Sequence, residues 1–126
     1  MPHSDSSPEY WFDLASDDEE SARILVRESA PPDIAAYHFH QSLEKILKGH
    51  IARATADIPR IHDLERLFRK VQSLGIDVHE DAFDRVALIQ SFYSDFRYPR
   101  GARIVSSDLA RIVTAFDEAK AMLAGR

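Results

Sequence analysis

Apolar residues in this chain recur at helical spacing, and this periodicity limits the fold more than any other sequence feature. The segment after residue 63, for example, places apolar side chains at i, i+3, i+4 and i+7. No segment shows the sustained alternation of period two that a half-buried strand would need. The sequence therefore predicts an all-α, up-and-down bundle of about five helices. The apolar faces contain Tyr10, Trp11, Leu14, Ala15, Ala22, Leu25 and Val26; Ala35, Phe39, Leu43, Ile46 and Leu47; Leu64, Leu67, Phe68, Val71 and Leu74; Leu88, Ile89, Phe92 and Phe96; and Leu109, Ile112, Val113, Phe116 and Leu123.

Prolines, a glycine and capping residues mark the predicted ends of these helices. The prolines at 31–32 end the first helix, and Asp33 is placed to cap the second. Gly75 lies where a C-terminal cap belongs, and Pro99 is expected to stop the fourth helix. The serines at 106–107 offer caps for the last helix.

Length and composition indicate one soluble domain. A chain of 126 residues fits a single core, with residues 1–9 expected as a flexible tail and 10–126 as the domain. The absence of cysteine excludes disulfides, thiolate metal sites and a cysteine nucleophile. No apolar run reaches the roughly 18 residues of a membrane span, and the N-terminus lacks the features of a secretion signal. We therefore expect a cytoplasmic protein without a membrane segment.

The net charge of −5 is unevenly distributed. Residues 1–33 hold nine acidic and two basic side chains, whereas the rest of the chain holds 12 acidic and 14 basic ones. A wholesale nucleic-acid binder would normally carry a stronger basic excess. A local basic pocket remains compatible with this balance.

The segment AAYHFHQSLEKILKGHI, residues 35–51, carries the most polar chemistry of any predicted helix. On a regular helix its polar side chains line one strip about 120° wide beside the apolar stripe. One interpretation is a binding site. The other is a solvated face on which Glu44 and Lys48 form an ordinary i, i+4 pair. The strip contains His38, Gln41, Glu44, Lys45 and Lys48.

Other polar residues of the first two helices have simpler interpretations. His50 falls within the apolar arc, which is typical of a histidine at the edge of the core. His40 and Glu44 have the i, i+4 spacing of two metal ligands, but no further motif completes a set, so we predict no metal site. Asp18 falls on the apolar face of the first helix, where an unpaired carboxylate is unfavourable. Either a cation meets it, the surface there is wet, or the helix is rotated from our estimate.

The segment SDFRYPRGAR brings several arginines to the end of the fourth helix and just beyond it. Arg97, Arg100 and Arg103 could simply interact with the negative end of the helix dipole. They could also hold phosphates while the ring of Tyr98 stacks on a base.

Three motifs in order give this chain a resemblance to the HEPN domain, a small helical bundle. YHFHQSLEKILKGHI, HDL at 62–64 and RYP at 97–99 are similar to the motifs of that family, over about residues 10–123. The acidic residue of the family's first helix is matched by Asp18. The family's second-helix pattern corresponds to His38, Gln41, Glu44, Lys45 and Lys48, HDL to His62, Asp63 and Leu64, and RYP to Arg97, Tyr98 and Pro99.

The resemblance implies a nucleotide- or RNA-binding module that forms a homodimer and acts with a minimal nucleotidyltransferase, as in a toxin–antitoxin-like pair. It implies no cofactor. Nucleotide or phosphate would be bound by His38, Gln41, Lys45, Lys48, Arg97 and Tyr98, with Asp18, Glu44 and Asp63 supporting them.

The chain departs from the family where ribonuclease members carry their catalytic motif. Many HEPN proteins are metal-independent ribonucleases that use an arginine followed four to six residues later by histidine. No histidine follows Arg97, so whether this chain is an enzyme stays open. One alternative is a rearranged ribonuclease site in which Arg97 holds the phosphate and His38 or His62 is the base. Another is a dimerisation or scaffold protein without a small ligand.

A second departure concerns the residue before HDL. Ile61 stands where family members often carry a capping serine or threonine. We expect Asp63 to provide that cap instead.

Overall fold

Five helices form the bundle, as predicted. The structure is a computed structural model, and it describes residues 7–93 and 103–124. Within those residues there is no strand, and none of the helices is long and apolar enough to span a membrane. The helices are α1 (Pro8–Arg27), α2 (Pro32–Ala52), α3 (Leu64–Ser73), α4 (Ala82–Ser91) and α5 (Ser106–Leu123).

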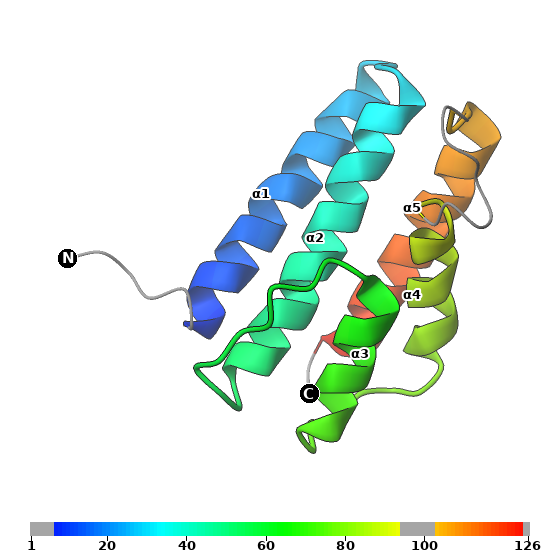
Figure 1. The fold of residues 1–126 in the computed structure, drawn as a ribbon. Helices are drawn as coiled ribbons and strands as arrows, with labels where there is room; N and C mark the ends of the chain where they lie inside the picture. Colours follow the sequence, from blue (N-terminus) through cyan, green and yellow to red (C-terminus); the bar gives the residue numbers. More distant parts are fainter. Residues whose placement is uncertain (1–6, 94–102, 125–126) are drawn as a thin grey trace.

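Helix α2 is the centre of the bundle. It runs antiparallel to α1, and α3, α4 and α5 pack on its other side (Figure 1). Its apolar residues Phe39, Leu43 and Leu47 are fully buried, as their spacing predicted. Helices α1, α3 and α5 therefore pack directly on α2, whereas α4 packs mainly on α5 and α3.

Small residues let α1 approach α2 closely. Ala15 and Ala22 are the buried residues of α1, and Ser42 Oγ donates to the Ala15 carbonyl oxygen at 2.7 Å. At Gly49 of α2, an added Cβ would lie 2.5 Å from the ring of Phe12. Glycine at this position therefore permits the observed contact between the two helices.

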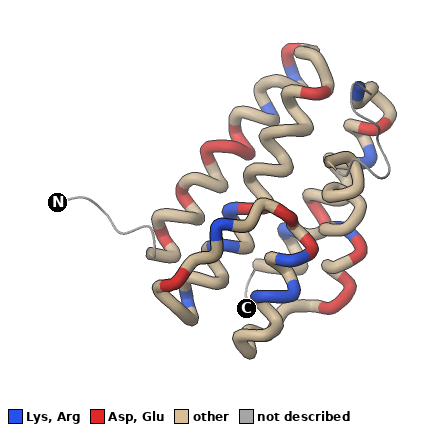
Figure 2. The backbone as a smooth tube through the Cα atoms, viewed as in Figure 1, with Lys and Arg blue, Asp and Glu red and all other residues tan. Residues whose placement is uncertain are grey.

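The last turn of α1 differs from the prediction. Val26, expected on the packed face, is exposed because the core contact of α1 ends near Ala22. Arg23, the residue after Ala22, lies over the ring of Phe39, and its guanidinium carbon is 5.3 Å from the ring centroid. The same side chain pairs with Asp117 of α5. Several positions along α1 are acidic residues (Figure 2), and Glu19 is paired with both Arg23 and Lys120.

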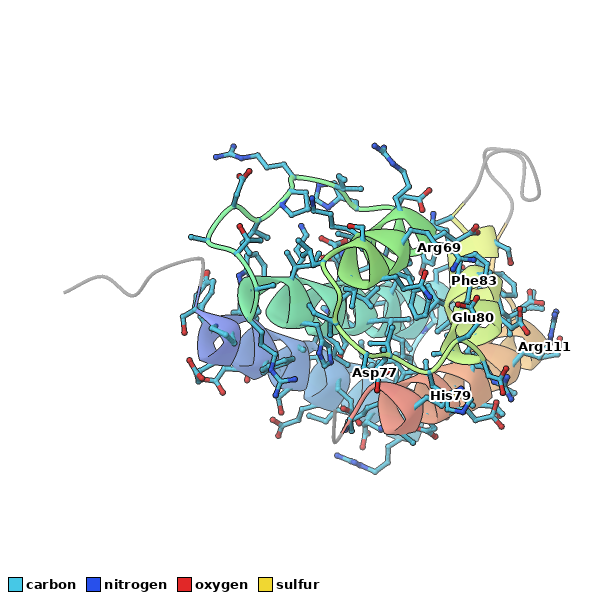
Figure 3. All side chains as sticks on the ribbon, turned by 90° about the horizontal axis from the view of Figure 1, so that it is seen from below. Arg69, Asp77, His79, Glu80, Phe83 and Arg111 are labelled. Atoms are coloured by element: carbon cyan, nitrogen blue, oxygen red, sulfur yellow. The ribbon has the colours of Figure 1, made fainter. Side chains whose placement is uncertain are left out.

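An arginine and a glycine organise the hairpin of α3 and α4. The Arg69 guanidinium lies 3.9 Å from the centroid of the Phe83 ring and pairs with Glu80 at 3.3 Å; Figure 3 shows the three together. Gly75, just beyond α3, has a φ of 79°, which a residue with a Cβ adopts only with strain. The predicted C-terminal cap is thus confirmed.

Of the predicted N-terminal caps, two are wrong and one is confirmed. Asp63 caps α3, accepting from the Arg66 amide at 3.0 Å. Asp33 is already inside α2, because the helix begins at Pro32, and its carboxylate accepts instead from the Ile104 amide and from Arg103. Helix α5 likewise starts at the predicted serines, so Val105 is the N-cap residue. Because valine has no side-chain acceptor, the capping contact is that of Asp108, which accepts from the Val105 amide.

Two other helix ends also differ from the prediction. Helix α1 begins at Pro8, two residues into the expected tail, because Ser7 accepts from the Tyr10 amide and Pro8 occupies the first turn. Helix α4 ends at Ser91, where i to i+3 bonds close its last turn. The prediction that Pro99 sets this end is therefore wrong, and Phe96 and Pro99 lie outside the described residues.

The half-buried side-chain amide of Gln90 joins three helices. The Gln90 Oε1 of α4 accepts from the Leu64 amide at 2.9 Å and lies 3.1 Å from His40 Nε2. Because an amide oxygen can only accept, His40 carries its proton on Nε2. Burial lowers the pKa of His40 below 6.5, and burial likewise lowers that of His50, which is buried as predicted.

Acidification should destabilise the fold through these two histidines. Below about pH 6.5 the imidazoles of the unfolded chain bind protons, whereas the buried imidazoles of the folded chain stay neutral. The free energy of unfolding therefore falls as the pH drops through that value. Each histidine contributes at most about 1.4 kcal/mol per pH unit. Urea unfolding between pH 7 and 5 should give a shallower pH dependence for His40→Gln than for the native sequence. Parallel profiles for the two proteins would contradict the assignment.

Candidate functional site

A carboxylate of α1 holds two polar residues of α2. Asp18 Oδ1 lies 2.9 Å from His38 Nδ1, and its Oδ2 accepts from Lys45 Nζ. The three side chains, which we call the Asp18 cluster, are mostly buried but retain some exposure. Of the possibilities considered for Asp18, the structure thus supports a cation partner on a correctly oriented α1.

A second carboxylate makes the same kind of arrangement one to two turns further along α2. Glu44 Oε2 accepts from Lys48 Nζ at 3.1 Å and lies 2.9 Å from His62 Nδ1. The Glu44 and Lys48 side chains are only 4% and 7% exposed, whereas His62 is 77% exposed. Glu44 Oε1 has no hydrogen-bond partner. We call Glu44, Lys48 and His62 the Glu44 cluster.

The polar strip is therefore not a solvated face. The predicted i, i+4 pair of Glu44 and Lys48 is present, but it is buried. A single unpaired charge in that position would be strongly unfavourable, so burial of each side chain depends on the presence of the other. Gln41 lies between the two clusters and is half-buried.

An aromatic ring borders the Glu44 cluster. Lys48 Nζ lies 5.5 Å from the centroid of the half-buried Trp11 ring, within the range of a cation–π contact. Beside it is a pocket of about 480 Å³ between the start of α1 and the link from α2 to α3. Trp11, Lys48, Ile58, Pro59 and Arg60 are among the residues that line it.

The sequence did not identify Trp11 and Arg60 as site residues. Trp11 had been counted only as part of an apolar helix face, and Arg60 only as part of a loop. Their positions depend on how α1 and the α2–α3 link pack on α2, which no local motif encodes. The one available signal was that Trp11 lies seven residues before Asp18, two helical turns along the same face.

The arginine segment is only partly described. Arg97, Tyr98 and Arg100 lie outside the described residues, so the expected convergence of Arg97 with His38 and Lys45 stays a prediction. Arg103 pairs with Asp33 rather than with the end of α4. Before the undescribed segment, the ring of Tyr93 lies 4.4 Å from that of His40, centroid to centroid.

Both flanks of the undescribed segment thus contact the same side of α2. On a regular helix, Asp33 and His40 both project about 200° from His38. They are closer in angle to Glu44, at about 20 to 40°.

The described residues offer no metal centre. No group of three or more histidine, aspartate or glutamate side chains among them could hold an ion. His40 Nε2 is occupied by Gln90, and Glu44 is engaged by Lys48 and His62.

Comparison with known protein families identifies the family of this chain. The HEPN domain family matches residues 8–124, nearly the whole chain. This chain belongs to the HEPN family. No curated protein and no solved structure matched it. In this HEPN protein the matched region contains both the Asp18 cluster and the Glu44 cluster.

Removing one member of the buried ion pair should destabilise the HEPN fold far more than removing both. Glu44→Leu leaves Lys48 buried without its carboxylate, so we expect the free energy of unfolding to fall by about 3–5 kcal/mol. The double variant Glu44→Leu/Lys48→Met should recover most of that loss. Urea unfolding of the single and double variants measures both changes in the free energy of unfolding.

The exposed pair of Arg85 and Glu118 provides the control. Glu118→Gln should lower the free energy of unfolding by no more than about 1 kcal/mol. A loss equally small for Glu44→Leu would show that Lys48 reaches water.

Proposed function

We propose that this HEPN protein is a cytoplasmic nucleotide- or RNA-binding module. In this proposal it forms a homodimer and acts with a minimal nucleotidyltransferase, as one half of a toxin–antitoxin-like pair. HEPN proteins often pair with nucleotidyltransferases. The observation that carries the binding function is the repetition of one arrangement, a carboxylate holding a lysine and a histidine, in two clusters along α2.

The two clusters have the chemistry of a phosphate site. An ammonium group has three N–H donors, and Lys45 and Lys48 each use one on a carboxylate. The carboxylate fixes the position of the cation and leaves donors for a second acceptor. The adjacent histidine uses its Nδ1–H on the carboxylate, so its Nε2 can donate to phosphate only in the imidazolium form, in which the cluster has a net positive charge. His38, Gln41, Lys45 and Lys48 would contact phosphate, with Asp18 and Glu44 orienting them.

Trp11 supports a nucleotide rather than a bare phosphate. Its ring borders a pocket that also contains Lys48 and Arg60. Aromatic rings bind bases by stacking, and a neighbouring cation holds the backbone. A nucleotide could therefore place its base near Trp11 and its phosphate near Lys48.

Arg97 and Tyr98 enter the proposal on sequence grounds. The RYP motif assigns them to phosphate binding and base stacking, and Asp63 supports the neighbouring HDL segment as a helix cap. In this proposal Arg97 meets the phosphate beside His38 and Lys45 of α2.

Exposed apolar residues support the homodimer. They gather around the turn between α1 and α2, at the end of the bundle where Arg103 also contacts Asp33. Apolar side chains grouped in this way are typical of a protein–protein contact. The residues are Ile24, Val26, Ile34, Tyr37 and Val105.

Binding can be measured with the protein's own fluorescence. Trp11 is the sole tryptophan of the chain, so its emission reports on the pocket beside Lys48. Titration with mononucleotides and short single-stranded RNA should change this emission, and the affinity should weaken as salt rises. Lys45→Ala and Arg97→Ala should each weaken binding at least tenfold, whereas Lys70→Ala, at an exposed position on α3, should not. Unchanged affinity in both site variants would refute the pocket assignment and favour a scaffold without a small ligand.

A metal-independent ribonuclease is the second candidate, and the geometry of His62 favours it. Glu44 holds His62 Nδ1 at 2.9 Å, while the side chain is largely exposed. A carboxylate that fixes one ring nitrogen orients the imidazole and supports the other nitrogen as a base. Arg97 would stabilise the charge that develops on the phosphate. His38, held by Asp18, is the other candidate base.

An RNA digestion assay with chelator present separates the two candidates. An enzyme should cleave single-stranded RNA, and either His62→Ala or His38→Ala should reduce the rate at least a hundredfold. His79→Ala, at an exposed position between α3 and α4, is the matched control. Binding without cleavage would support the binding module, and cleavage that survives both variants would refute His62 and His38 as the base.

A further inference from the structure

The pocket beside Trp11 has few side chains that can recognise a base. Its wall is formed mostly by residues 56–60 of the link from α2 to α3, and this link lies along α2 (Figure 1). Three of those five residues have no hydrogen-bonding side chain. From the link, only an aspartate and an arginine can therefore contact a base edge with a polar side chain. The residues of the lining are Trp11, Lys48, Ala56, Asp57, Ile58, Pro59 and Arg60.

Asp57 provides the one carboxylate of this lining. The residue is exposed, and within the described part of the chain no hydrogen bond or ion pair engages its side chain. Its main chain is anchored in the link, because the Asp57 amide donates to Thr55 Oγ1 at 3.1 Å. Both carboxylate oxygens are thus available to a ligand in the pocket.

Charge decides which part of a nucleotide Asp57 can meet. Lys48 Nζ lies 5.5 Å from the centroid of the Trp11 ring, and Arg60 is exposed without a partner among the described residues. These two cations suit the phosphate, whereas a carboxylate repels it. Asp57 is therefore suited to an uncharged part of the nucleotide, and the base is the part that would lie beside Trp11.

A carboxylate distinguishes bases by the donors that they present. It has two acceptor oxygens and no donor. Guanine presents two adjacent donors, N1–H and the 2-amino group, which match the two oxygens as a bidentate pair. Adenine and cytosine each place a ring acceptor beside their amino donor, and uracil places its one N–H between two carbonyl oxygens. Only guanine therefore satisfies both oxygens without placing an acceptor against one of them.

We propose that this pocket selects guanine, and that Asp57 is the residue that determines the specificity. The base would stack near Trp11, its N1–H and 2-amino group would donate to the Asp57 carboxylate, and the phosphate would face Lys48 and Arg60. This selectivity rests on the proposed nucleotide-binding function and adds a base preference to it. In RNA, the same contacts would favour an unpaired guanosine.

Calorimetric titration of the full-length protein with mononucleotides measures the preference. GMP should bind at least about tenfold more tightly than AMP, CMP and UMP. IMP, which keeps N1–H but lacks the 2-amino group, should bind about fivefold more weakly than GMP. Equal affinity for all of them would overturn the guanine assignment and leave the nucleotide site standing, as would a carboxylate that meets the ribose. If none of them binds, the proposed function and its base preference are both refuted.

Substitution of Asp57 should change the preference rather than abolish binding. Asp57→Asn replaces one acceptor oxygen by an N–H donor, which suits xanthine because xanthine has a carbonyl group in place of the 2-amino group. The variant should bind xanthosine monophosphate at least about fivefold more tightly than GMP, whereas the native sequence should prefer GMP. Because Asp57 is exposed, the substitution should leave the fold intact. A variant that keeps the native preference for GMP would refute the role of Asp57.

Two further variants serve as controls. Asp77→Asn, at an exposed position between α3 and α4 (Figure 3), should leave every affinity unchanged. Arg60→Gln should weaken the binding of all mononucleotides alike, because Arg60 is assigned to the phosphate that they share. A change of base preference in Arg60→Gln without one in Asp57→Asn would assign the base to Arg60 and overturn the proposal.

Discussion

The pairing of buried carboxylates with lysines between α1 and the α2–α3 link is the interaction on which this structure depends. Asp18 and Glu44 lie where an apolar contact would be expected, and each is acceptable there only because a lysine of α2 meets it. The pair of Asp18 and Lys45 in turn requires α1 to lie close to α2, which the small residues Ala15 and Gly49 permit. Helix packing and electrostatics are therefore one problem in this protein. A change in the distance between the two helices would also change how the charges are satisfied.

This arrangement gives α2 two chemically different sides. One side carries lysines and histidines held by carboxylates, and it borders Trp11. Another carries a neutral histidine in an apolar pocket. The remaining surface of α2 is core. A single central helix therefore provides two different chemical environments, because each outer helix covers only part of its circumference.

The sequence predicted the parts of the fold that local rules govern. Apolar spacing located all five helices, Asp63 was recognised as a cap, and Gly75 as a helix end. Angular position also placed the residues of the polar strip correctly around α2. Burial could not be read in the same way, because the depth of Glu44 and Lys48 depends on how closely neighbouring segments pack over them. The role of Asp33 was missed for a related reason, since its partners, Arg103 and the Ile104 amide, are some seventy residues away in the chain.

The oxygen of Gln90 has a consequence for how the chain folds. This one atom serves both the first amide of α3 and the imidazole of His40 in α2. The first turn of α3 therefore lacks a complete set of acceptors until α4 is docked. The short helices α3 and α4 are each ten residues long, below the length at which an isolated helix persists in water. The two are thus expected to order together on a preformed α2, as one cooperative unit rather than as successive local events.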